Sequence, residues 1–248
     1  MVKIALDAGH GLYTAGKRCM KALDPNETRE WVLNSKDFVK LEKLLLEYQN
    51  VEVMRVDDVT GRVDLPLADK TAKANNWGAN IYLSNHRNAG IYGGTGGGIV
   101  VYRHPTSSTA SQVYQQMLYN HLIVNTGLRG NRSTPLGLAN FAVLRLTYMP
   151  ALLIEGGFMD SQTDTPIILT ERFSDQMTQA YLNFLVEAFN LQKKPVVVPV
   201  VVKKDTVLPD GSFFRVVVGS FQSRNNATEV QEKLKGAGFD SFLTIYKK

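Results

Sequence analysis

The chain has 248 residues, of which 44% are hydrophobic and 21% are charged, and its formal net charge is +5. This composition is typical of a globular protein, and the length allows one good-sized domain and a small second one. The single cysteine, Cys19, excludes an intramolecular disulfide framework and a metal site made of several cysteines.

Charge and hydropathy also limit the partners of the chain. A basic balance favours an anionic partner such as nucleic acid, a membrane surface or a wall polymer. The basic runs are only lysine pairs, and no basic helix has interleaved aromatic residues, so we expect no nucleic-acid partner. No apolar run approaches the ~20 residues that span a bilayer, so we expect no membrane insertion.

Up to about residue 190, segments typical of strands alternate with segments typical of helices. In chain order, we expect a strand at residues 2–6, a helix at 28–48, a strand at 51–56, a helix at 67–77, strands at 80–83 and 98–102, a helix at 107–125, strands at 141–146 and 151–154, and a helix at 173–189. This alternation predicts an α/β fold with a mostly parallel twisted sheet and helices on both faces, which we assign to one domain at residues 1–191.

The composition changes after this domain. Residues 193–205 read KKPVVVPVVVKKD, which indicates an extended linker at residues 192–208, with an edge strand as the alternative. A strand at 214–218, a helix at 225–235 and a strand at 241–246 then predict a small βαβ module within residues 209–248. A unit this short can hardly hold a core of its own.

Three polar side chains lie where the predicted sheet would carry a site. His10 follows the first strand, His86 follows the third, and Glu155 ends the apolar run ALLI. In open α/β sheets the ligand crevice lies beyond the carboxyl ends of the strands. We therefore expect these three residues at the same edge of the sheet.

Glu30 is the fourth candidate, and its pattern leaves two interpretations open. It lies on a mostly apolar helical stripe with Leu33, Asp37, Leu41, Leu44 and Tyr48. A carboxylate on a buried stripe is costly unless it is paired or bound to a metal. An acid in the first turn of a helix is also common in solvent, where it favours the helix start.

Two histidines and one carboxylate form the ligand set of a catalytic zinc site, whose fourth position is left for water. A second carboxylate nearby, here Glu155, would take the proton of that water and pass it to a leaving amine. The candidate ligands are far apart in the sequence and match no local zinc signature such as HExxH, so their spacing alone is a weak signal.

Four motifs, in order, resemble those of the zinc-dependent N-acetylmuramoyl-L-alanine amidases over residues 3 to about 190. They are LDAGHG at 6–11, ETREWVLN at 27–34, SNHRNAG at 84–90 followed by GGTGGGIVVY, and LRLTYMPALLIEGGFMDSQTD at 144–164. Four ordered motifs at compatible spacing are far more specific than any one of them.

The resemblance implies roles for four residues. His10, Glu30 and His86 would bind Zn²⁺, and Glu155 would act as general base and then as general acid. The substrate would be peptidoglycan, cut by zinc-activated water at the amide between the lactyl group of N-acetylmuramic acid and the L-alanine of the stem peptide.

The other polar residues near these motifs are assigned lesser roles. Asn88 is expected to contact substrate or to orient the His86 loop. Arg145 would hold a substrate carboxylate or, as we prefer, have a structural role. His104 is expected in a surface loop, with the rim of the cleft as the alternative, and His121 is expected to be at the surface or partly buried. Cys19 is expected to be a bystander because no triad accompanies it.

The C-terminal unit resembles the first half of a SPOR domain, a βαββαβ module that binds peptidoglycan. The resemblance implies attachment to the wall through this half module. Two chains would complete the module as a dimer; the alternative is a remnant.

Two other functions remain in competition with the amidase. One is a catalytically inactive amidase fold kept for wall binding, and the other is a different zinc peptidase on a related sheet. The N-terminus shows no signal-peptide architecture. We therefore expect a protein made in the cytoplasm that reaches the wall after holin-mediated release, as a phage endolysin does, or after lysis of the mother cell, as a sporulation autolysin does.

Overall fold

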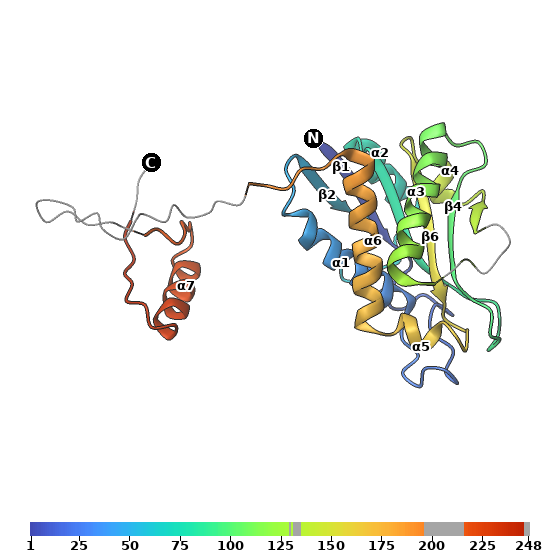
Figure 1. The fold of residues 1–248 in the computed structure, drawn as a ribbon, viewed down its shortest axis with the longest axis horizontal. Coiled ribbons are helices and arrows are strands. Elements are labelled where there is room, and N and C mark those ends of the chain that lie inside the picture. The colour runs from blue at the N-terminus through green and yellow to red at the C-terminus, as the bar shows by residue number, and fades with distance from the viewer. Residues whose placement is uncertain (129, 131–134, 196–215, 246–248) are drawn as a thin grey trace, which may run out of the picture. The chain divides into compact units, whose positions relative to one another are not determined.

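The computed structural model describes residues 1–128, 130, 135–195 and 216–245, in two units at Met1–Val196 and Val197–Lys248 (Figure 1). The strands of the first unit are β1 (Val2–Ala8), β2 (Val51–Arg55), β3 (Ile81–Asn88), β4 (Ile99–Arg103), β5 (Leu136–Leu138) and β6 (Ala151–Phe158). Its helices are α1 (Glu30–Leu45), α2 (Leu67–Trp77), α3 (Thr109–Thr126), α4 (Ala142–Arg145), α5 (Thr165–Ile168) and α6 (Glu171–Phe189).

The strands form one sheet in the order β2-β1-β3-β6-β4-β5. The first four strands in this order are parallel, β4 runs antiparallel to β6, and β5 is parallel to β4. The predicted α/β class with a mostly parallel sheet is therefore confirmed. The parallel register brings the carboxyl ends of β1, β3 and β6 to the same edge, which is where the candidate site residues lie.

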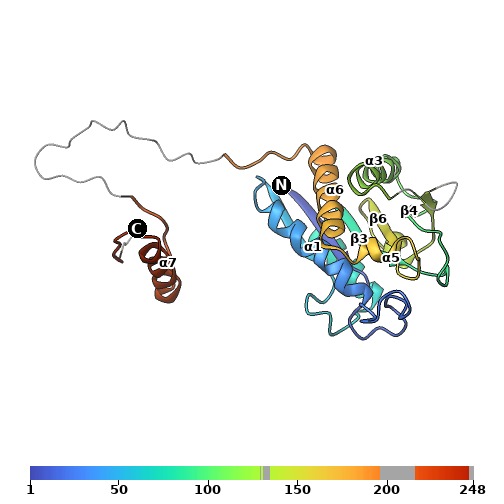
Figure 2. The same cartoon turned by 60° about the horizontal axis from the view of Figure 1, so that its bottom comes forward.

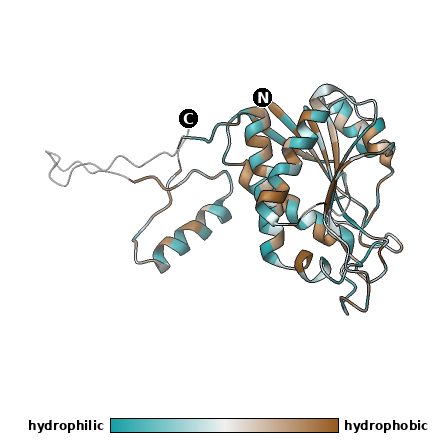
Figure 3. Cartoon of the chain, turned by 45° about the vertical axis from the view of Figure 1, so that its right-hand side comes forward, coloured by the Kyte–Doolittle hydropathy of each residue, from teal (hydrophilic) through white to brown (hydrophobic). Residues whose placement is uncertain are grey.

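Each face of the sheet has its own hydrophobic core, because successive side chains of a strand point to opposite faces. Ile81 and Leu83 of β3 join the core that contains side chains of α1, α3 and α6, whereas Tyr82 joins the core that contains side chains of α2 and α4. Figures 1 and 2 show α1, α6 and α3 side by side along one face. Hydrophobic residues gather on the strands between the two helix layers (Figure 3).

A buried polar network ties α1 to the carboxyl end of β3. The guanidinium of Arg87 pairs with the carboxylate of Asp37 at 2.6 Å, and both side chains are almost fully buried. Asn85 donates to Asp37 and accepts from the hydroxyl of Tyr181 on α6. Because a buried ion pair must be matched closely in geometry, this network fixes the first turns of α1 against the end of β3.

The prediction of a strand at residues 141–146 is wrong, because this segment contains the short helix α4. Val143 and Leu144 are both buried in the core shared with α2. A strand would turn two adjacent side chains to opposite faces, whereas one helical turn buries both on the same side. The short edge strand β5 and the helix α5 were not predicted.

Three strands are longer than expected, and the first of them, β1, extends to Ala8. β3 extends to Asn88 and β6 extends to Phe158, so His86 and Glu155 lie within their strands and do not follow or end them. Apart from Phe158, the residues that extend β3 and β6 are polar or glycine, which hides their strand character from a hydrophobic pattern.

The C-terminal unit contains the predicted helix, α7 (Arg224–Gly236). The strands expected around it are not formed at residues 216–218 and 241–245, and the remaining residues of both segments lie outside the described part. α7 has no buried residue, so the described residues of this unit offer no core to which strands can attach. Most of the predicted linker, from residue 196 on, also lies outside the described residues. In the described part of the chain, no helix is long and apolar enough to cross a membrane.

Candidate active site

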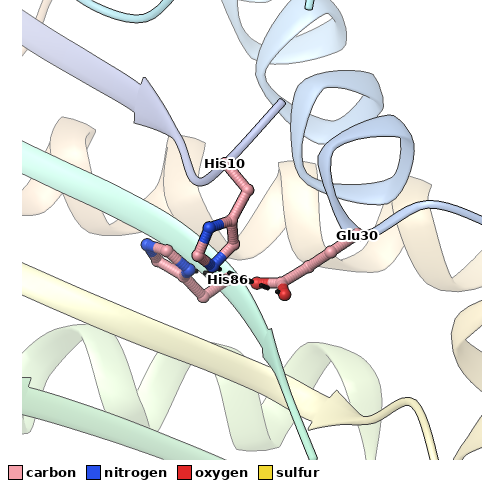
Figure 4. Close-up of side chains that lie close together, drawn as sticks. All are labelled: His10, Glu30 and His86. Carbon is pink, nitrogen blue, oxygen red and sulfur yellow. Dashed lines mark hydrogen bonds and ion pairs between the residues drawn. The ribbon is translucent and has the colours of Figure 1, made fainter. Parts of the chain in front are cut away.

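Three of the predicted residues converge at the carboxyl edge of the sheet (Figure 4). His10 lies just after β1, in a left-handed backbone conformation with φ of 67°. Glu30 is the first residue of α1, and His86 lies in β3. The close approach of these three side chains depends on the sheet and on the docking of α1, because they are far apart in the sequence.

The three side chains point toward a common centre. Nδ1 of His86 is 3.0 Å from Oε1 of Glu30, and Nε2 of His10 is 3.6 Å from Oε2 of the same carboxylate. The two imidazole rings meet edge to face, with centroids 5.0 Å apart. One ligand atom from each residue lies within 4.8 Å of the other two, which is close enough to hold a single metal ion.

The charges of this cluster are mutually dependent. Burial alone would raise the pKa of Glu30, but the hydrogen bond from His86 and the charges of His86, His10 and Lys17 outweigh it, so this pKa is lowered. Burial would lower the pKa of His86, but its hydrogen bond and attraction to Glu30 raise it above the usual value. The pKa of His10 is lowered, mainly by burial. Glu30 is therefore a carboxylate at neutral pH.

Glu155 faces the same site from the neighbouring strand. It pairs in register with His86, and it lines a cavity of about 280 Å³ together with Glu30, Lys17, Arg87 and Asn88. Burial raises the pKa of Glu155 to about 7. Its buried Oε2 has no hydrogen-bond partner in the described structure. A carboxyl group with a pKa near neutrality suits proton transfer in both directions.

The residues present fit a zinc ion. Two imidazole nitrogens and one carboxylate oxygen are the donor set of a catalytic zinc site with an open position. Oε2 of Glu30 is buried and accepts no hydrogen bond from the described residues. A buried carboxylate oxygen without a donor is costly, and a cation at this place would satisfy it.

The remaining predicted residues are distributed over the molecule. Asn88 lines the cavity and accepts, through its backbone carbonyl, a hydrogen bond from Met159. Arg145 lies on α4, where it donates to Asn140. His104 also contacts Asn140, and His121 pairs with Glu187 on α6. Burial raises the pKa of the Cys19 thiol to about 12, so this residue is not a thiolate nucleophile.

Several residues that contact the cluster were not among the predicted site residues. Lys17 reaches within 4.0 Å of Glu30 Oε2, and the backbone N–H of Arg87 donates to Glu30 Oε1. Asp64 lies 3.7 Å from Nδ1 of His10. Asp37 was visible on the apolar stripe of α1, and a buried acid there is a signal for a buried basic partner such as Arg87. The loop residues Lys17 and Asp64 gave no such signal.

Gly9 lies against the ring of His86, which predicts a sharp effect of a single methyl group. A Cβ at this position would lie 2.0 Å from Cε1 of His86, so Gly9→Ala is expected to displace the imidazole and to weaken zinc binding, measured by competition with a chromogenic chelator. Gly96→Ala is the matched control, because its Cβ would meet only Ile91, at 4.0 Å. Equal zinc affinity of the two variants would contradict this packing argument.

The fold and the site together define an α/β protein with a candidate mononuclear metal centre and an adjacent carboxylic acid. The model of the N-acetylmuramoyl-L-alanine amidase family (Amidase_3) matches residues 4–187, and the model of the SPOR domain matches residues 188–244. The chain belongs to the N-acetylmuramoyl-L-alanine amidase family and carries a SPOR domain after its amidase domain. Its enzymatic activity is that of an N-acetylmuramoyl-L-alanine amidase, acting on peptidoglycan.

Two relatives that match along most of their length support this assignment. The chain is 32% identical to the N-acetylmuramoyl-L-alanine amidase CwlM of Bacillus licheniformis over 252 residues, which covers 100% of this chain and 86% of the relative. It is also 32% identical to the sporulation-specific N-acetylmuramoyl-L-alanine amidase of Bacillus subtilis, over 99% of this chain and 85% of the relative. The catalytic domain of CwlV from Bacillus (Paenibacillus) polymyxa has the same fold, with a TM-score of 0.68 and 23% identity over 77% of this chain and 100% of that domain.

Proposed function

We propose that this amidase cleaves the bond between the lactyl group of N-acetylmuramic acid and L-alanine with the help of one zinc ion. His10, Glu30 and His86 would hold the ion, and Glu155 would transfer the proton. The observation that carries the proposal is the convergence of these four side chains from β1, α1, β3 and β6 at one edge of the sheet.

Each side chain has a task that follows from its position. When bound, Zn²⁺ supplies a Lewis acid and lowers the pKa of a bound water toward ~7. Glu155, as a carboxylate, accepts the proton of the attacking water and then donates it to the departing alanine nitrogen. Its raised pKa makes both halves of this transfer accessible near neutral pH. Asn88 lines the cavity and would contact the substrate, whereas we propose a structural role for Arg145, which is bonded to Asn140.

The test is digestion of purified cell-wall sacculi by the full chain, with and without a chelator. Clearing of the suspension with new N-terminal alanine, lost on chelation and restored by zinc, is the expected result. New N-termini other than alanine would point to a zinc peptidase. No release by the zinc-loaded protein from walls of several chemotypes would favour an inactive, wall-binding amidase fold.

We further propose a division of labour along the chain: catalysis in residues 1–191, a linker at 192–208 and wall binding by a half SPOR module at 209–248. The SPOR match supports wall binding. Deletion from Lys193 onward is therefore expected to reduce the fraction of protein that pellets with sacculi, while hydrolysis of soluble muropeptides continues. Unchanged pelleting of the truncated chain would argue against this role.

We also propose that two chains pair through this module. α7 buries no side chain within its own unit, and Val216, Val217 and Phe239 nearby are exposed, so the unit presents apolar surface that a second copy would cover.

We propose that the protein reaches the wall after holin action or after lysis of the mother cell. The similarity to a sporulation-specific amidase supports the second route.

A further inference from the structure

A buried chain of polar groups leads from α2 to the ring of His86. Nζ of Lys70 lies 3.0 Å from Oδ1 of Asp7, on β1. Oδ2 of Asp7 accepts a hydrogen bond of 2.8 Å from the hydroxyl of Ser84 on β3. Oγ of Ser84 is in turn 3.1 Å from Nε2 of His86. We call these three residues the Lys70–Asp7–Ser84 chain.

The direction of every hydrogen bond in this chain follows from the number of protons available. An ionised carboxylate only accepts, and a serine hydroxyl has one proton to donate. Asp7 faces an ammonium group and also accepts from the hydroxyl of Tyr82 at 3.0 Å, so the proton of Ser84 points at Asp7. The oxygen of Ser84 is then left as an acceptor, and its partner is the N–H at Nε2 of His86.

Burial makes this arrangement persistent. Asp7 and Lys70 are each 1% exposed and Ser84 is 0% exposed, so solvent does not replace one partner by another. Without Lys70, the carboxylate of Asp7 would be a buried charge that has lost its ion-pair partner. The other ion pair of Lys70 among the described residues is with Asp64, at 3.7 Å, which is itself acidic. Lys70 thus holds Asp7 as the acceptor at the end of the chain.

We propose that the Lys70–Asp7–Ser84 chain commits Nε2 of His86 to a hydrogen bond and thereby selects Nδ1 as the atom that ligates the metal. Nδ1 is the ring nitrogen that faces Glu30, at 3.0 Å from Oε1. A histidine ligand that donates its other ring N–H is fixed in tautomer and orientation. Ser84, Asp7 and Lys70 are positioning residues in this scheme, which rests on the proposed zinc site and assigns its ligand atom.

The direct test is NMR of the zinc-loaded full chain with ¹⁵N-labelled histidine. The expected spectrum shows the His86 ring with its proton on Nε2 and with the metal at Nδ1. A proton on Nδ1 with the metal at Nε2 would overturn the inference. This measurement identifies the ligand atom directly. If the Lys70–Asp7–Ser84 chain only supported the fold, it would not determine which ring nitrogen binds the metal.

Zinc affinity gives a second, independent test. Ser84→Ala removes the acceptor and is expected to weaken zinc binding about 10–100-fold. Ser174→Ala is the matched control, because Ser174 is also buried and its hydroxyl has no hydrogen-bond partner among the described residues. Lys70→Arg keeps the positive charge and is expected to retain more zinc affinity than Lys70→Met. If Lys70→Met does not fold, the comparison of Ser84→Ala with Ser174→Ala tests the inference by itself.

The outcomes separate this inference from the proposed function. A wild-type chain that binds no zinc would refute the zinc site. A wild-type chain that binds zinc, with Ser84→Ala binding equally tightly, would refute only the role of the Lys70–Asp7–Ser84 chain.

Discussion

Replacing Glu155 by glutamine is expected to lower the turnover of wall substrate by about 10²–10⁴-fold, the usual contribution of a positioned general acid and base. Glutamine has the same shape but accepts no proton from water at neutral pH and donates none as an acid. Because Glu155 does not belong to the ligand set of His10, Glu30 and His86, zinc binding is expected to persist. Turnover and zinc content of the same preparation are the measurements.

The same substitution is expected to stabilise the zinc-free protein at alkaline pH. Burial raises the pKa of Glu155 from 4.5 to about 7, so the folded state binds the proton more tightly than the unfolded state. Stability contributed by the protonated acid is present below pH 4.5 and declines as the pH rises toward 7. Glu155→Gln avoids this loss, so its denaturation midpoint is expected to exceed that of the wild type at pH 8 and to approach it at pH 4.5. A variant that is less stable at pH 8 would contradict the burial argument.

Glu30→Gln is expected to abolish wall hydrolysis by a different route, the loss of the metal. The substitution keeps the size of the side chain but removes the charge that faces both histidines. The loss of zinc affinity should exceed the about 10–100-fold expected for an outer-shell partner, because a ligand itself is altered. Zinc retained after dialysis, measured by atomic absorption, and lysis of sacculi are the two readouts.

Glu42→Gln provides the control for this experiment. Glu42 lies on the same helix and pairs with Arg55 at 3.5 Å, away from the cluster of His10, Glu30 and His86. Wild-type zinc content is expected in this variant. If Glu30→Gln retained zinc as Glu42→Gln does, Glu30 would not be a ligand and the assignment of the site would need revision.

The family and its activity were readable from the sequence, because four motifs in a fixed order carry them. The longer helices of the main domain were also readable, since α1 and α6 have apolar stripes that a 3.6-residue period reveals. The secondary structure of the short segments was not readable in this way. A short, mostly apolar segment such as residues 141–146 has no period that distinguishes a strand from a helical turn, and only the burial of Val143 and Leu144 on one side decides it.

The sequence by itself determined which side chains are available to the site: His10, Glu30, His86 and Glu155. The tertiary structure decided how they meet. Strand register sets His86 opposite Glu155, the Arg87–Asp37 pair holds α1 against β3, and the Lys70–Asp7–Ser84 chain reaches His86 from the far side of its ring. These contacts join residues from distant parts of the chain. A local sequence pattern does not predict these contacts, because they form only once the sheet has assembled and its helices have docked.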